Sequence, residues 1–127
     1  MVTEPRSLPS TASAQEAGEV LTKPEVRAVF VVDADGRLEG VITRKTLVST
    51  VVALGRDPRS TPLAEIAEAP HYTIAPELPL EEAFRFLEER DAERVPVVEP
   101  DGKLIGVLSR SVLQRRLAED EEATPDE

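Results

Sequence analysis

The sequence contains no cysteine and no tryptophan, and aromatic residues make up only 3% of its 127 residues. A chain without cysteine forms no disulfide, no thiolate metal site and no cysteine nucleophile, which fits a protein of the cytoplasm. Because aromatic side chains are so few, the core must consist of Val, Leu, Ile and Ala. Each large aliphatic side chain contributes roughly 1.5–3 kcal/mol when buried. These absences favour a small aliphatic fold without redox chemistry.

Long apolar runs are also missing, and charge of one sign dominates. No run approaches the roughly 20 residues of a membrane span, and residues 1–13 are rich in Pro, Ser and Thr instead of forming an apolar leader. The formal charge is −10, from 25 acidic and 15 basic residues. With no dense basic patch to offset the repulsion, this charge opposes binding to nucleic acid and to anionic membranes. A small anion can still bind where two arginines meet.

A repeat organises the chain. Residues 31–47 return 66 residues later as residues 97–113, with nine of 17 positions identical and four more conservatively replaced. The same offset lays residues 14–21 over residues 80–87, so each unit includes a helix upstream of its strands. We therefore expect a first repeat at 5–55, a linker at 56–69, a second repeat at 70–118 and an unstructured acidic tail at 119–127.

Each repeat is expected to have the order β-α-β-β-α, a mixed α+β fold. An Asp-Gly pair between two apolar runs predicts a hairpin in each repeat, at Asp35-Gly36 and at Asp101-Gly102. Ser13 and Glu16 have the spacing of a helix capping box. The expected helices are residues 14–23, 44–54, 79–90 and 110–118, with one further turn at 63–67 and short leading strands at 7–8 and 72–74.

Two motifs resemble a known family. Residues 95–98 read Val-Pro-Val-Val, an acidic-Gly turn follows, and residues 106–110 read Gly-Val-Leu-Ser-Arg at the start of a helix. This pattern resembles a CBS domain (cystathionine-β-synthase-type domain), and the tandem arrangement resembles a Bateman module. The resemblance implies two repeats packed with pseudo-twofold symmetry around two clefts. In many relatives these clefts bind adenine nucleotides. For this chain the resemblance implies AMP, ADP, ATP or S-adenosylmethionine as a regulatory ligand, and it implies no cofactor.

The resemblance also implies ligand-binding positions. Thr43 and Ser109 match a hydroxyl residue that contacts phosphate or ribose, and the arginine after each lies at a helix N-terminus that favours an anion. Of the two clefts, the second, near Ser109 and Arg110, is expected to be the better site. The full set of candidate residues is Tyr72, Thr73, Val95, Pro96, Ser109, Arg110, Ser7, Phe30, Thr43 and Arg44.

Two features depart from the family pattern. The aspartate that holds ribose in relatives is replaced by Thr46 in the first repeat and by Val112 in the second. Phe30 stands where a proline is expected, and its ring is expected to fill part of the first cleft. Loss of a hydrogen bond to a charged group weakens binding by about 10- to 100-fold.

Structural explanations for several candidates remain open. Thr43 and Ser109 can serve as helix N-caps, and Arg44 and Arg110 can form surface ion pairs. His71 has no second histidine or cysteine with which to bind a metal, and we interpret it as an exposed linker residue. No set of residues typical of catalysis is present, so we expect no enzyme activity.

Two functions therefore remain. The first is a sensor in which a nucleotide enters the cleft, contacts both repeats and shifts their packing, to which a protein partner responds. The second is an interaction module that binds no ligand and serves as a dimerisation platform. Both interpretations include a homodimer, and the missing aspartates favour the second.

Overall fold

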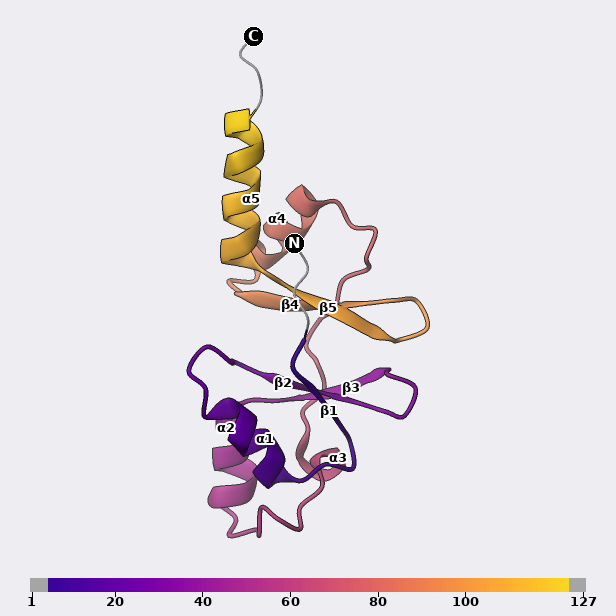
Figure 1. Cartoon of the computed structure of the whole chain (residues 1–127), viewed down its shortest axis with the longest axis vertical. Helices are drawn as coiled ribbons and strands as arrows, with labels where there is room; N and C mark the ends of the chain where they lie inside the picture. The colour runs from indigo at the N-terminus through magenta and orange to yellow at the C-terminus, as the bar shows by residue number, and fades with distance from the viewer. Residues whose placement is uncertain (1–4, 124–127) are drawn as a thin grey trace.

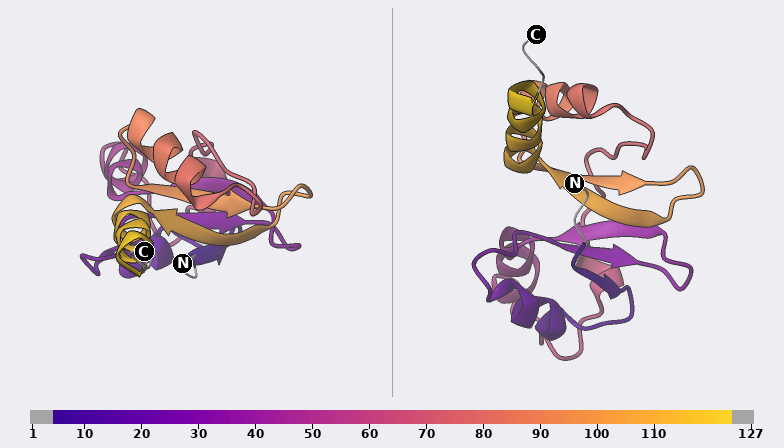
Figure 2. Two further views of the ribbon diagram at one scale, coloured as in Figure 1. Left: turned by 90° about the horizontal axis from the view of Figure 1, so that it is seen from above. Right: turned by 45° about the horizontal axis from the view of Figure 1, so that its top comes forward.

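The computed structural model describes residues 5–123. Figure 1 shows two β-sheets facing each other across the middle of the molecule, with helices on the outer side of each sheet. The views in Figure 2 show the same layers, with the strands of the two sheets stacked over one another. The expected mixed α+β fold with two repeats is confirmed.

The first repeat forms a three-stranded sheet in the order β1-β2-β3. Strand β1 pairs parallel to β2, and β2 pairs antiparallel to β3. Its elements are β1 (Ser7–Pro9), α1 (Ala14–Leu21), β2 (Val29–Val32), β3 (Leu38–Ile42), α2 (Arg44–Leu47) and the π-helix η1 (Val48–Val52). The capping box at Ser13 and Glu16 is present, because each side chain accepts a hydrogen bond from the other residue's backbone N–H.

The second repeat forms an antiparallel pair of strands, β4-β5, covered by two helices. Its elements are α4 (Leu80–Glu89), β4 (Arg94–Val98), β5 (Leu104–Ser109) and α5 (Arg110–Ala123). Helix α5 continues past the expected boundary at residue 118. Residues 119–123, which the sequence assigns to an unstructured tail, are therefore helical, and residues 124–127 of that tail lie outside the described residues.

The expected leading strand at residues 72–74 is reduced to a single bridge at Ile74. In the first repeat, Phe30 N–H donates to the carbonyl of Arg6 over 2.8 Å and extends the β1 pairing. The equivalent residue in the second repeat is Pro96, which has no N–H to donate. The second repeat therefore lacks the hydrogen bond that extends the pairing of β1 in the first repeat, and its leading segment forms only the bridge at Ile74.

The expected helix at residues 44–54 changes its winding after one turn. Two hydroxyl groups in it donate to backbone carbonyls, Ser49 Oγ to Lys45 O at 2.8 Å and Thr50 Oγ1 to Thr46 O. Such side-chain bonds compete with the helical backbone pattern. Residues 48–52 accordingly form η1.

The linker packs on the first repeat. Helix α3 (Leu63–Ile66) supplies two buried side chains to the first core, and Leu63 N–H donates to Ala12 O at 2.9 Å. Further on, Glu68 and Val41 exchange two backbone hydrogen bonds of 3.0 and 2.9 Å, so the chain runs along the edge of β3 before it enters the second repeat. Each repeat has its own aliphatic core.

The two hairpin turns join the repeats. Leu38 N–H donates to Gly102 O at 2.9 Å, and Leu104 N–H donates to Gly36 O at 3.0 Å. These residues are equivalent under the 66-residue offset, so the pair of bonds lies on the pseudo-twofold axis. Both glycines have positive φ, of 84° and 97°, which other residues rarely adopt.

Asp33 orders the first of these turns. Its Oδ1 accepts hydrogen bonds of 2.9 Å from the backbone N–H groups of Arg37 and Asp35. These bonds, with that from Arg37 the strongest influence, hold the pKa of the Asp33 carboxyl below its usual value. The ionised carboxylate is therefore the form that the folded turn prefers.

We expect Asp33→Asn to lower stability at neutral pH and to lower it less as the pH falls. A carboxylate with a lowered folded-state pKa contributes stability above its unfolded pKa of about 3.9. That contribution disappears as the pH falls through the folded-state pKa. Denaturant melts of both proteins between neutral pH and about pH 3 measure this difference. A difference that does not change with pH would show that the turn does not recognise the charge.

Candidate functional site

A cavity of about 320 Å³ lies between the two repeats. The first repeat contributes one wall, and the second repeat, including its first residues 70–72, contributes the other. The lining residues are Arg27, Ala28, Phe30, Val41, Thr43, Pro70, His71, Tyr72, Glu93, Arg94 and Pro96. Because both repeats form its walls, a molecule in this cavity contacts both of them at once.

Tyr72 is held against the second repeat. Its ring meets Phe86 of α4 edge to face, with the ring centroids 5.5 Å apart. The guanidinium of Arg90 also packs on Phe86, with Cζ 3.7 Å from the ring centroid. Tyr72, Phe30 and Pro96 together give the cavity flat apolar surfaces suited to a planar ring.

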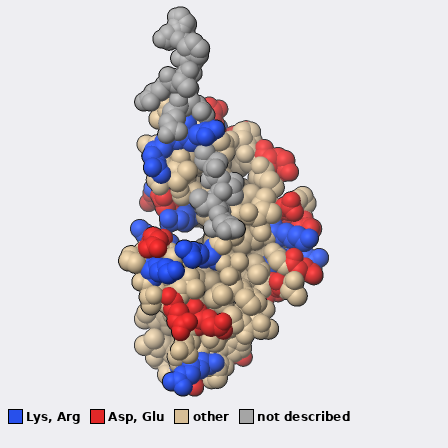
Figure 3. Space-filling model, in the orientation of Figure 1, with Lys and Arg blue, Asp and Glu red and all other residues tan. Residues whose placement is uncertain are grey.

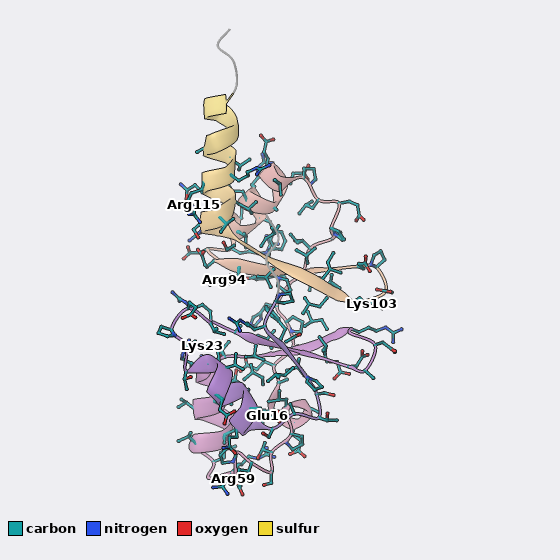
Figure 4. All side chains as sticks on the ribbon, in the orientation of Figure 1. Glu16, Lys23, Arg59, Arg94, Lys103 and Arg115 are labelled. Carbon is teal, nitrogen blue, oxygen red and sulfur yellow. The ribbon has the colours of Figure 1, made fainter. Side chains whose placement is uncertain are left out.

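Two arginines give the cleft its positive charge. Arg27 precedes β2 and Arg94 begins β4, and both line this cavity and a second one of about 170 Å³. The ion pairs between described side chains join Arg37 to Asp35, Arg56 to Glu65 and Arg110 to Asp91. Arg27 and Arg94 take part in none of them. Figure 4 labels Arg94 on β4, on the edge that overlooks the first repeat.

The second cavity is smaller and more basic. Arg6 joins Arg27 and Arg94 in its lining, and Glu25 is the one acidic residue among the lining residues. Phe30 borders both cavities, as expected for a ring that fills part of the cleft. Figure 3 shows Lys and Arg side chains at mid-height on both sides of the molecule, interspersed with acidic side chains.

Thr43 lines the larger cavity and also caps α2. Its Oγ1 accepts a hydrogen bond of 3.2 Å from Thr46 N–H, while Thr46 Oγ1 accepts one of 3.1 Å from Thr43 N–H. Thr46 is fully buried, and its hydroxyl is 3.0 Å from that of Thr43. The residue at the usual ribose position therefore completes a capping box and does not line the cavity.

Ser109 and Arg110, the residues of the preferred second cleft, line neither of these two cavities. Ser109 Oγ caps α5 by accepting from Val112 N–H at 3.2 Å, and Arg110 pairs with Asp91 at 3.4 Å. Arg44 donates to the carbonyls of Leu21 and Lys23, at 2.7 and 2.9 Å, at the end of α1. Ser109 thus serves as the helix cap and Arg110 forms the ion pair that their structural explanations describe, whereas Arg44 binds backbone carbonyls in place of the expected carboxylate.

Three further candidates lie outside both cavities. Val95 is fully buried in the second core, Ser7 pairs with Phe30 at the edge of the first sheet, and Thr73 is exposed. Of the ten candidates, the structure therefore brings Thr43, Tyr72, Phe30 and Pro96 together in one cavity. Each cavity combines residues of both repeats, so a ligand in either one would contact both repeats.

Sequence reasoning missed the charged residues of the cleft. Arg27 and Glu93 are equivalent under the 66-residue offset, as are Ala28 and Arg94. All four lie just before or at the start of a strand that faces the other repeat. That position is the signal that could have identified them. His71 is exposed, as expected of a linker residue, but it also lines the larger cavity.

Two β-α-β-β-α repeats that face each other across a cleft define a class of tandem-repeat regulatory modules. The family model for the CBS domain matches residues 1–53 and 59–119. The chain belongs to the CBS-domain family and contains a tandem pair of these domains.

Known proteins show the same relationship. The uncharacterized protein MK0525 of Methanopyrus kandleri is 28% identical over 82% of this chain, which spans about half (54%) of that protein. Hypoxic response protein 1 of Mycobacterium tuberculosis is 26% identical over 81% of this chain and 71% of its own length. The structure of CBS domain protein PAE2072 from Pyrobaculum aerophilum, complexed with AMP, is 27% identical, with a TM-score of 0.70 over 94% of this chain and 95% of that one.

Among the helices of residues 5–123, none combines the length and the apolar character that a membrane crossing requires. The described side chains, those of residues 5–118, include no group of three or more His, Cys, Asp or Glu residues placed to hold a metal ion.

Proposed function

We propose that this chain is a regulatory module of the cytoplasm that binds an adenine nucleotide or a related small anion between its two repeats. The observation that carries the proposal is the pair Arg27 and Arg94, which line both cavities without an ion pair to a described carboxylate. On a chain of net charge −10, two such guanidinium groups form a local positive site. Arginine is well suited to phosphate because its planar fork donates two hydrogen bonds together.

The shape of the larger cavity supports the same ligand class. The apolar surfaces of Phe30, Tyr72 and Pro96 suit a base, and Thr43 offers a hydroxyl beside them. PAE2072, which resembles this chain over nearly its whole length, was solved with AMP. A ligand that contacts both repeats stabilises one relative arrangement of them, and a protein partner can recognise that arrangement. We assign no catalytic step to the chain.

Arg27→Ala and Arg94→Ala are each expected to weaken ligand binding by about 10- to 100-fold, because each removes a charge-assisted hydrogen bond to phosphate. Calorimetric titration of the intact chain with AMP, ADP, ATP and S-adenosylmethionine measures the affinity. Thermal unfolding provides a second readout, since a ligand that binds only the folded state raises its stability.

Arg59→Ala is the matched control. Arg59 is exposed and lies at the far end of the molecule from the cleft (Figure 4), so its replacement is expected to leave the affinity unchanged. Equal affinities in all three variants would place the ligand elsewhere.

The second candidate function is an interaction module that binds no ligand. Burial of Thr46 favours it, since the side chain at the usual ribose position cannot reach the cavity. If none of the four ligands binds or raises the melting temperature, this second function becomes the better one.

A further inference from the structure

The smaller of the two cavities is the counterpart of the larger one under the 66-residue offset. Arg6 and Val107 line the smaller cavity, and the equivalent residues Tyr72 and Val41 line the larger one. The two cavities are therefore the two clefts of one pseudo-twofold pair. Differences between them come from residues that have diverged between the repeats.

The two cavities differ in size. The larger one, of about 320 Å³, lies within the range of roughly 300–1,000 Å³ that is usual for small-molecule pockets. The smaller one, of about 170 Å³, lies well below that range. It therefore suits a ligand with fewer atoms than a nucleotide.

Guanidinium groups are more concentrated in the smaller cavity. Three arginines and one glutamate line it, against two arginines and one glutamate in the larger cavity. These residues are Arg6, Arg27, Arg94 and Glu25 in the smaller cavity and Arg27, Arg94 and Glu93 in the larger one. The smaller cavity thus has one more guanidinium group in a smaller volume.

The additional guanidinium group belongs to Arg6 and stands in the place of an aromatic ring. Because Arg6 is equivalent to Tyr72, the smaller cavity has a cation where the larger one has a flat surface suited to a base. The backbone of Arg6 is fixed, since its carbonyl accepts the 2.8 Å hydrogen bond from Phe30 N–H. Its side chain takes part in none of the ion pairs between described side chains. Arg6 is therefore held beside the cavity with a guanidinium group that no described carboxylate neutralises.

We propose that the smaller cavity is a second site, separate from the nucleotide site, which binds a small oxyanion such as inorganic phosphate. Guanidinium groups from both repeats surround this cavity, and each of them can donate charge-assisted hydrogen bonds to the oxygens of one phosphate group. The inference goes beyond the nucleotide site proposed above, because the cavity, the ligand and one of the arginines are different. It shares with that site the arginines Arg27 and Arg94.

The two sites are expected to oppose each other. Since Arg27 and Arg94 line both cavities, a guanidinium group that donates to phosphate in one cavity is less available to a ligand in the other. Two anions held by the same cations also repel each other. By linkage, phosphate weakens nucleotide binding by the same factor by which the nucleotide weakens phosphate binding. The pair of sites then responds to the ratio of nucleotide to free phosphate.

Arg6→Ala is expected to weaken phosphate binding by about 10-fold or more, because it removes a charge-assisted hydrogen bond. It is expected to leave AMP binding unchanged, since Arg6 does not line the larger cavity. NMR titration of the intact chain with sodium phosphate, at an ionic strength held constant with sodium chloride, measures the first affinity. Calorimetric titration with AMP in a phosphate-free buffer measures the second.

Two variants control for charge and for folding. Arg6→Lys keeps the positive charge and is expected to retain part of the phosphate affinity that Arg6→Ala loses. Arg59→Ala removes an exposed arginine at the far end of the molecule (Figure 4) and is expected to change neither affinity. Because Arg6 is exposed and forms its backbone bond through the carbonyl, Arg6→Ala is expected to fold, which circular dichroism checks.

The opposition between the sites has its own measurement. Saturating phosphate is expected to raise the dissociation constant of AMP by about 5-fold or more in the wild-type chain, relative to sodium chloride of equal ionic strength. In Arg6→Ala the same concentration of phosphate is expected to have a smaller effect, because less of it is bound.

The outcomes separate this inference from the nucleotide site. A chain that binds AMP but no phosphate at millimolar concentrations would overturn the oxyanion site and leave the proposed function standing. In that case, a loss of ATP affinity without a loss of AMP affinity in Arg6→Ala would assign the smaller cavity to the phosphate chain of a nucleotide. Phosphate binding that Arg6→Ala leaves unchanged would also overturn the site. Binding of phosphate through Arg6, with no binding of any nucleotide, would support the oxyanion site and contradict the proposed function.

Discussion

Replacing Leu63 by alanine is expected to lower the free energy of unfolding by about 2–5 kcal/mol, the usual cost of removing a fully buried leucine. Leu63 has no exposed surface and lies in the core of the first repeat. It belongs to α3, in the segment that the sequence assigns to the linker. Loss of its side chain leaves a cavity in that core and removes the anchor of the linker.

Chemical denaturation followed by circular dichroism measures this loss. Ile105→Ala is the control, because Ile105 is 42% exposed and its truncation is expected to cost less than about 1 kcal/mol. If the two variants lost equal stability, α3 would not be part of the first core in solution.

Local sequence signals predicted much of the fold. The capping box at Ser13 and the Asp-Gly turns depend on residues within four positions of one another, so the local sequence alone specifies them. The 66-residue repeat then gave the order of elements in both halves. The bonds between Gly36 and Leu104 and between Leu38 and Gly102 could not be predicted in this way, because they depend on how one repeat faces the other.

The differences between the expected site residues and those that line the cavities have the same origin. Ser109 and Arg110 match the family motif locally, but α5 and the loop before β4 occupy their polar groups, at Val112 and Asp91. Arg27 and Arg94 match no motif, and they line one cavity only because the two repeats face each other. A local pattern specifies which residue caps a helix, whereas a cleft between repeats depends on contacts far apart in the sequence.

The packing of the linker on β3 affects the larger cavity, because the chain runs directly from the linker into a wall of that cavity. Glu68 pairs with Val41 on β3. A few residues further along the chain, Pro70, His71 and Tyr72 form part of the wall of the larger cavity. The position of that wall therefore depends on how closely the linker approaches β3. Gly40 is the residue that permits this approach, because it has no side chain toward the linker.

Gly40→Ala is therefore expected to lower the free energy of unfolding by about 1–3 kcal/mol, as overpacking usually does. The new Cβ would lie 2.7 Å from Ala67 Cβ and 3.0 Å from Glu68 O, so the linker must move away from β3. Because Tyr72 follows on the same segment, ligand affinity in the larger cavity is expected to fall as well. Denaturant melts and calorimetric titration measure the two effects on the same protein.

Two further variants separate this steric cause from a general intolerance of alanine. Gly40→Ala combined with Ala67→Gly removes the closer of the two contacts and is expected to recover part of the stability, with the contact to Glu68 O remaining. Gly18→Ala makes the same substitution where the nearest atom is 3.8 Å away, and in dilute solution it is expected to stabilise α1 by about 0.5–1 kcal/mol. If the double variant recovered no stability, the close contact between Gly40 and Ala67 would not determine where the linker lies relative to β3.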